Sequence, residues 1–236
     1  MHPFTMPQWA IDRVLERRNK LHVCDDLDPR RTALVVVDLQ NGFMTKEHSI
    51  RPVETAIGTV PNVNKLAGTL RAHGGKVVWI KNTNDETNRD SWSNWFAMGK
   101  PAMTEKRFST FIEGAPGHAL YPELVVHPDD MIVKKYRFSA FLPESSDLAE
   151  RLRALGIDTV LIVGTVTNVC CESSARDAMM MNFRTMMVSD GNSAFSDHEH
   201  TATLAAFYAI FGDVMTTDEV CAVIERNGQA LPVAAE

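Results

Sequence analysis

The sequence predicts an α/β protein with three layers, in which helices cover both faces of a parallel sheet. Six short runs of apolar or β-branched residues alternate with amphipathic stretches whose apolar residues recur at three- and four-residue spacing. Strands without a polar face are typical of parallel sheets, because helices bury such sheets from both sides. The alternation also favours right-handed crossovers that keep neighbouring strands parallel.

The elements follow one another without repeats, low-complexity tracts or linkers rich in proline and glycine. Residues 1–30 are expected to be an N-terminal extension that packs on the body or on another subunit. Residues 31–236 are expected to form a single domain. The predicted strands are Ala33–Asp38, Lys76–Lys81, Met131–Lys134, Thr159–Gly164, Arg184–Asp190 and Asp213–Thr216. The predicted helices are Gln8–Lys20, Val60–His73, Ser146–Leu155, Cys170–Phe183, His198–Phe211 and Thr217–Arg226.

Composition and charge exclude several classes of protein. The 236 residues are 44% hydrophobic and 23% charged, which fits a soluble globular domain with a substantial core. The formal net charge is -6 and no basic stripe is present, so neither nucleic acid nor a membrane is an expected partner. No apolar run approaches the roughly 20 residues of a membrane helix, and the pattern of a secretory leader is missing. The cysteines show neither a disulfide framework nor zinc spacing, so a cytoplasmic location is expected.

One segment, 82–123, interrupts the alternation of strands and helices. It is too long for a simple connection, and it leaves the second predicted strand at its carboxyl end, where open parallel sheets bind ligands. It contains Trp92, Trp95 and Phe96, which could form the wall of a small pocket. A surface excursion that packs its own aromatic side chains is the alternative.

Three charged or reactive side chains follow predicted strands. Asp38 ends the first strand, Lys135 follows the third, and Cys170 follows the fourth and opens a predicted helix. Parallel strands gather their carboxyl ends on one edge, so a carboxylate, an ammonium and a thiol could share a pocket. A helix N-terminus favours the thiolate through its free N–H groups and its dipole. Each side chain also has a structural interpretation, as a cap or salt bridge, a solvated lysine and a buried packing cysteine.

Three segments resemble the signature blocks of the isochorismatase-like cysteine hydrolases. They are ALVVVDLQNGF at 33–43, KYRFSAF at 135–141 and GTVTNVCCESSARDA at 164–178, in the family's order and spacing. The resemblance covers about residues 31–223. It implies a six-stranded parallel sheet in the order 3-2-1-4-5-6 and a catalytic triad of Asp38, Lys135 and Cys170.

The resemblance also implies details of this site. The family lysine lies four residues before the serine of the Ser-Ala-Phe sequence, which selects Lys135 over its neighbour Lys134. Family members have a non-proline cis peptide before the cysteine, which here would join Thr165 to Val166. The backbone N–H groups of Val166 and Cys170 would then form an oxyanion hole.

Within the family, the sequence is most similar to amidohydrolases that cleave a C–N bond of a small amide or ureide through a thioester. N-carbamoyl, ureidoacrylate-like and biuret-like compounds are the expected substrates. Isochorismatases cleave a vinyl ether without the cysteine. Nicotinamidases hold a metal through an Asp-x-His pair that is missing between the first strand and the aromatic segment, so we expect no metal and no cofactor. A vinyl-ether hydrolase, a nicotinamidase-like amidase and a non-catalytic binding protein are the alternatives.

Residues that contact the substrate can be named as candidates. Polar side chains after the first strand could orient the substrate or cap the next helix, and an arginine after the third strand could bind a substrate carboxylate or form a structural salt bridge. We expect a homodimer or homotetramer, in which a neighbouring subunit could complete the pocket. The candidates are Gln40, Asn41, Arg137 and the aromatic residues Trp92, Trp95 and Phe96.

Overall fold

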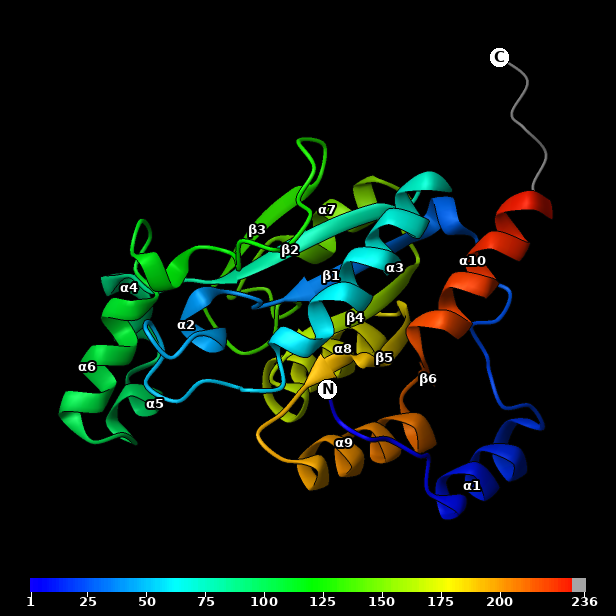
Figure 1. The fold of residues 1–236 in the computed structure, drawn as a ribbon, viewed down its shortest axis with the longest axis horizontal. Helices are drawn as coiled ribbons and strands as arrows, with labels where there is room; N and C mark the ends of the chain where they lie inside the picture. Colours follow the sequence, from blue (N-terminus) through cyan, green and yellow to red (C-terminus); the bar gives the residue numbers. More distant parts are fainter. Residues whose placement is uncertain (231–236) are drawn as a thin grey trace.

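A six-stranded parallel sheet forms the centre of the computed structural model, which describes residues 1–230 (Figure 1). The strands lie in the order β3-β2-β1-β4-β5-β6, which confirms the expected order. Residues 231–236, the end of the predicted domain, lie outside the described residues. The strands are β1 (Thr32–Val37), β2 (Lys76–Asn82), β3 (Met131–Lys135), β4 (Thr159–Thr165), β5 (Arg184–Ser193) and β6 (Asp213–Met215).

The strand ends differ from the predicted ones where they build the site. β1 ends at Val37, because Asp38 has a left-handed backbone with a φ of 55° that cannot continue a strand. β3 includes Lys135, which the prediction placed just after the strand. β5 continues to Ser193, because it resumes pairing with β4 beyond an irregularity in the register.

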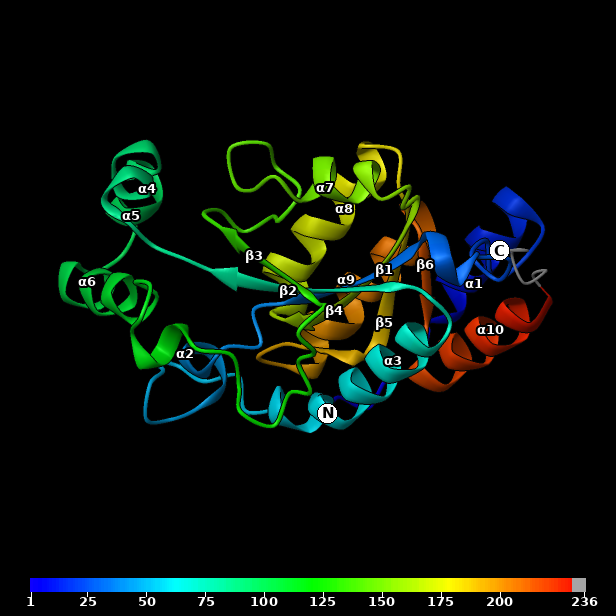
Figure 2. The ribbon, with the colours of Figure 1, turned by 90° about the horizontal axis from the view of Figure 1, so that it is seen from above.

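Helices cover both faces of the sheet, as predicted (Figure 2). The side chains of β1 alternate between the two faces: Ala33, Val35 and Val37 belong to one core, and Leu34 and Val36 to the other. The first core is covered by α7 (Leu148–Ala154), α8 (Glu172–Met180) and α9 (Asp197–Ile210), and the second by α3 (Val60–Ala72) and α10 (Thr217–Ala230).

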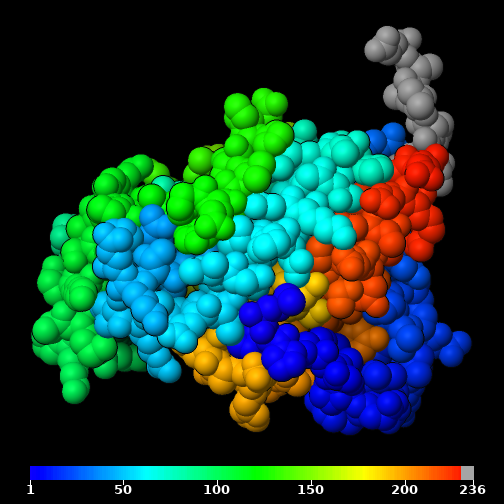
Figure 3. All heavy atoms as spheres, viewed as in Figure 1, coloured from blue at the N-terminus to red at the C-terminus, as the bar shows by residue number. Residues whose placement is uncertain are grey.

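The N-terminal residues pack on their own chain. Helix α1 (Gln8–Arg18) lies against α9 and contributes Ala10 and Val14 to the first core. His2 is buried, with its Nδ1 atom 2.6 Å from Asp197 Oδ1. Figure 3 shows these dark-blue residues lying across the surface beside the cyan and orange parts of the chain.

The chain between β2 and β3 forms helices beyond the carboxyl end of β2 (Figures 1 and 2). We call residues 82–123 the wall segment. The Asn84 side chain donates a hydrogen bond of 3.1 Å to the carbonyl of Phe108, which ties the start of this segment to a later part of it. None of the described helices is long and apolar enough to cross a membrane. The helices of the wall segment are α4 (Glu86–Ser91), α5 (Ser93–Ala97), α6 (Pro101–Thr110) and the 3-10 turn η3 (Pro116–His118).

Candidate active site

The structure brings Asp38, Lys135 and Cys170 together at the carboxyl edge of the sheet. Lys135 Nζ lies 2.8 Å from Asp38 Oδ2 and 3.6 Å from Cys170 Sγ. These groups come from the ends of β1, β3 and β4, so the sheet topology places three residues that are far apart in the chain within contact of one another.

Backbone and amide groups hold the two charged residues in place. The Asn82 N–H donates to Asp38 Oδ1 at 3.1 Å, and Lys135 Nζ donates to the Arg137 carbonyl at 3.0 Å. Both charged side chains are completely buried. Lys134 points to the surface instead and pairs with Glu113 at 2.6 Å. The structure therefore separates the two neighbouring lysines, and only Lys135 reaches Asp38.

The cysteine lies inside the first helical turn after β4, which corrects the prediction that a helix opens at Cys170. A π-helical turn, η4 (Thr167–Cys171), precedes α8. The peptide bond between Thr165 and Val166 is cis, as the resemblance implies. The Cys170 side chain is 4% exposed, and both Val166 and Cys170 line a cavity.

Burial controls the protonation of this cluster. Burial raises the pKa of Cys170 to about 12, although the Lys135 ammonium opposes that shift. Burial also raises the pKa of Asp38 despite the nearby ammonium. The pKa of Lys135 is raised as well: burial acts to lower it, but the charge of Asp38 and the interactions with Asp38 and Cys170 outweigh that effect. The resting cluster is therefore an ion pair beside a neutral thiol.

The raised pKa of the thiol has a measurable consequence. Alkylation of Cys170 by iodoacetamide is expected to accelerate about tenfold per pH unit between pH 7 and pH 10, because the thiolate fraction of a group with a pKa of about 12 keeps rising over that range. The rate can be measured by mass spectrometry of the Cys170 peptide. Glutathione in the same vessel serves as the control, because a free thiol with a pKa near 8.5 levels off by about pH 9. A plateau for Cys170 below pH 9 would contradict the neutral resting thiol.

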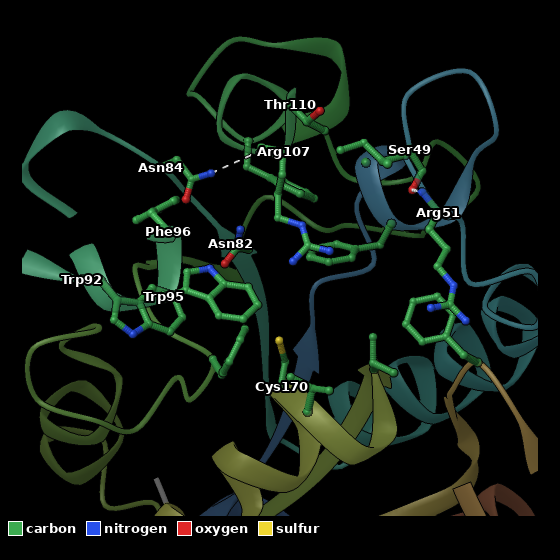
Figure 4. Close-up of a pocket in the computed structure, with 18 residues that line it drawn as sticks. Ser49, Arg51, Asn82, Asn84, Trp92, Trp95, Phe96, Arg107, Thr110 and Cys170 are labelled. Carbon is green, nitrogen blue, oxygen red and sulfur yellow. Dashed lines mark hydrogen bonds between the residues drawn. The ribbon is translucent and has the colours of Figure 1, made fainter. Parts of the chain in front are cut away.

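A cavity of about 160 Å³ opens above the Cys170 sulfur (Figure 4). The predicted aromatic residues Trp92, Trp95 and Phe96 all line it, and the two tryptophan rings stack with centroids 5.4 Å apart. Phe138 packs its edge against both tryptophans at 4.9 and 4.8 Å. The wall segment therefore packs some of its own aromatic residues and at the same time forms one side of the pocket.

The comparisons with known proteins agree with this geometry. A family model described as the Isochorismatase domain matches residues 32–219. The chain belongs to the isochorismatase family. Ureidoacrylate amidohydrolase RutB of Agrobacterium fabrum is 33% identical over 220 residues, which are 88% of this chain and 94% of that protein.

Solved structures of this family have the same fold. A cysteine hydrolase from Pseudomonas syringae pv. phaseolicola superimposes with a TM-score of 0.74 at 28% identity, covering 86% of this chain and 96% of the other. An N-carbamoylsarcosine amidase from Thermoplasma acidophilum superimposes with a TM-score of 0.62 at 27% identity, covering 80% and 97% of the two chains. The protein is therefore a hydrolase of the isochorismatase family, and amidohydrolases are among its relatives.

Three of the candidate substrate contacts lie outside the pocket of this isochorismatase-family protein. Gln40 is buried; its Oε1 atom accepts from the Asn82 N–H at 2.8 Å, and its Nε2 atom donates to the His118 carbonyl at 2.9 Å. Asn41 donates to a backbone carbonyl of η3 at 3.2 Å. Arg137 donates to Ser91 Oγ at 3.0 Å and lies over the Trp92 ring. Gln40 and Asn41 join the end of β1 to the wall segment, and Arg137 packs against a tryptophan that lines the pocket.

His118 does not line the pocket, and its side chain interacts with another residue of the wall segment. Its Nε2 atom is 2.9 Å from Thr83 Oγ1, and burial lowers its pKa to about 4, so it is neutral at physiological pH. Within residues 1–230, no group of three or more His, Cys, Asp and Glu side chains is placed to hold a metal ion.

Several polar residues of the pocket were not predicted from the sequence. Asn82 ends β2 and accepts a hydrogen bond of 3.5 Å from Lys135 Nζ, so the rule that identified the triad would also have identified it. Asn84 follows two residues later and lines the same cavity. Arg51 and Arg107 also line the cavity, but they come from a loop and from α6, where no sequence pattern marks them.

Proposed function

We propose that this protein is a metal-independent cysteine amidohydrolase that cleaves a C–N bond of a small amide or ureide through a thioester on Cys170. The observation that supports this function is a thiol at the floor of an aromatic pocket, in contact with a buried ammonium that pairs with a buried carboxylate. A vinyl-ether hydrolase has no use for the thiol. An acyl-transfer enzyme needs a nucleophile with an adjacent base.

The proposed reaction starts with Asp38 as the general base. Its carboxylate takes the thiol proton, and its raised pKa makes it a better acceptor than an exposed aspartate. The sulfur forms a bond to the carbonyl carbon while the carbonyl π electrons move to oxygen. The N–H groups of Val166 and Cys170 are the proposed donors to this oxyanion, and one such donor typically contributes about 10²–10³ in rate.

The second half of the reaction returns the enzyme to its resting state. The C–N bond breaks, and the leaving nitrogen takes the proton held by Asp38, which releases an amine or ammonia. Water then attacks the thioester, or the thiocarbamate formed from a ureide, while Asp38 accepts the proton of the water. The C–S bond breaks and the sulfur regains a proton from Asp38. Lys135 stays protonated throughout and stabilises each anionic state of Asp38 and Cys170.

The names of two relatives support the proposed substrate class. RutB is named a ureidoacrylate amidohydrolase, and the Thermoplasma protein an N-carbamoylsarcosine amidase. Both names denote hydrolysis of a C–N bond next to a urea-type carbonyl. We therefore place the substrate among small N-carbamoyl or other ureide compounds.

The release of ammonia or amine from amides and ureides, and of pyruvate from isochorismate, tests this proposal across a panel of compounds. The panel contains ureidoacrylate, N-carbamoyl amino acids, biuret and simple primary amides, with isochorismate and nicotinamide as discriminating substrates. We expect turnover of at least one ureide or amide and its loss after alkylation by iodoacetamide. Turnover of isochorismate alone that survives alkylation would assign the vinyl-ether reaction instead. Absence of any hydrolysis would identify a non-catalytic member of the family.

A further inference from the structure

The pocket is cationic although the protein is acidic. Its described lining contains two side chains that carry a full charge, Arg51 and Arg107, and no carboxylate. The whole chain has a formal net charge of -6. Asp38 and Lys135 lie beneath the floor and neutralise each other. The electrostatic field at the pocket therefore attracts a negatively charged ligand.

Each pocket arginine lies over an aromatic ring. Within residues 1–230, no hydrogen bond or ion pair engages the guanidinium of Arg51 or Arg107. Arg89, which belongs to the wall segment as Arg107 does, instead pairs with Glu105 at 3.0 Å. The two pocket arginines therefore keep all of their donors available for a ligand.

Arg107 is the arginine that faces the nucleophile. Figure 4 shows its side chain reaching from α6 into the pocket, toward the space above the Cys170 sulfur. Its guanidinium lies 5.6 Å from the centre of the Trp95 ring. Arg51 lies to one side, over the Phe195 ring at 4.3 Å. A hydrogen bond of 3.4 Å from the Asn84 amide to the Arg107 carbonyl fixes the backbone of α6 at this point.

The aromatic walls define the shape of the ligand between Cys170 and Arg107. The cavity of about 160 Å³ has nearly the volume of an engineered protein cavity that binds benzene, which is about 150 Å³. Stacked indole rings and the edge of Phe138 favour a flat, conjugated group. Arg107 is itself exposed, so its pairing with a ligand depends on the geometry of its hydrogen bonds as well as on charge.

We propose that Arg107 is a specificity-determining residue that binds a carboxylate at the end of the substrate remote from the scissile bond. This inference rests on the proposed function, because it assigns to the same pocket a residue that selects, among small amides and ureides, those that carry an acid group. The planar guanidinium can hold a carboxylate through two parallel hydrogen bonds. A neutral amide of the same size lacks that contact.

Protection of Cys170 against iodoacetamide tests this inference without any turnover. The probes are benzoate and nitrobenzene, which have the same shape and differ in charge. In the full-length protein, we expect benzoate to protect Cys170 at about tenfold lower concentration than nitrobenzene, because only benzoate can pair with Arg107. The rate of alkylation is measured at the Cys170 peptide by mass spectrometry.

Variants identify the residue responsible for the preference for benzoate. Arg107→Gln is expected to abolish the preference for benzoate while leaving protection by nitrobenzene unchanged. The matched control is Lys106→Gln, which removes the same charge from the neighbouring exposed residue of α6, outside the pocket lining, and is expected to keep the preference. No preference in the wild-type protein, or a preference that survives in Arg107→Gln, would overturn the inference. Loss of the preference in Arg51→Gln alone would assign the carboxylate to Arg51 instead.

Failure of this inference can be distinguished from failure of the proposed function. Release of ammonia reports on the function, and ligand protection reports on recognition of the carboxylate. If a ureide acid is turned over, Arg107→Gln is expected to raise its KM about tenfold with little change in kcat, and to leave the KM of the methyl ester unchanged. An equal loss for the acid and the ester would contradict recognition of the charge.

Discussion

Replacing Cys170 with alanine is expected to lower kcat/KM by at least about 10³-fold, because the variant loses the atom that forms the covalent bond to the substrate. Cys170→Ser is expected to lose nearly as much. A serine hydroxyl is far harder to ionise than a thiol, and the burial that raises the pKa of the thiol to about 12 penalises an alkoxide even more.

The measurement is the rate of ammonia release by each purified variant, with circular dichroism and the melting temperature as checks of the fold. Cys221→Ala is the control, because Cys221 lies on α10 in the core on the opposite face of the sheet. An active Cys170→Ala protein would contradict covalent catalysis. Loss of activity in Cys221→Ala would show that the effect reflects stability.

Breaking the buried ion pair from one side is expected to destabilise the fold by about 3–5 kcal/mol, because the remaining charge stays buried without a partner. Asp38→Asn leaves the Lys135 ammonium without its partner, and Lys135→Met leaves the Asp38 carboxylate without its partner. Both side chains are completely buried. The asparagine fits the left-handed backbone at position 38, so the change acts through charge and not through strain.

The double variant Asp38→Asn/Lys135→Met separates stability from catalysis. It removes both charges, so we expect it to regain most of the free energy of unfolding lost by the single variants, while all three proteins remain inactive. Urea denaturation gives the four free energies of the cycle. Additive losses in the double variant would show that Asp38 and Lys135 do not interact as the structure indicates.

The fold could be predicted because its signal is local and repeated. Runs such as Ala33–Val37 are apolar on both faces, and that property alone indicates a sheet covered on both sides. The meeting of Asp38, Lys135 and Cys170 could be predicted from two features: the carboxyl ends of parallel strands lie at one edge of the sheet, and the motif around Cys170 matches the family. The order of the strands came from the resemblance, because an apolar pattern does not say which strands are neighbours.

The remainder of the site depends on tertiary contacts that the sequence does not encode locally. The raised pKa of Cys170 depends on the packing that buries the thiol, which its place near a helix N-terminus does not indicate. Gln40 was a candidate substrate contact because it follows Asp38 closely, yet its amide satisfies buried backbone groups. Arg107 went unnoticed because only the path of the wall segment brings α6 over the pocket.

The covalent intermediate provides the most direct test of the proposed chemistry. Turnover of an active ureide or amide is stopped with acid within the first catalytic cycle, and the mass of the intact protein is measured, followed by that of its peptides. We predict a gain in mass equal to the acyl or carbamoyl group, located on the Cys170 peptide and missing in Cys170→Ala. Steady turnover without such an adduct, together with an active alanine variant, would contradict the nucleophilic role of this thiol.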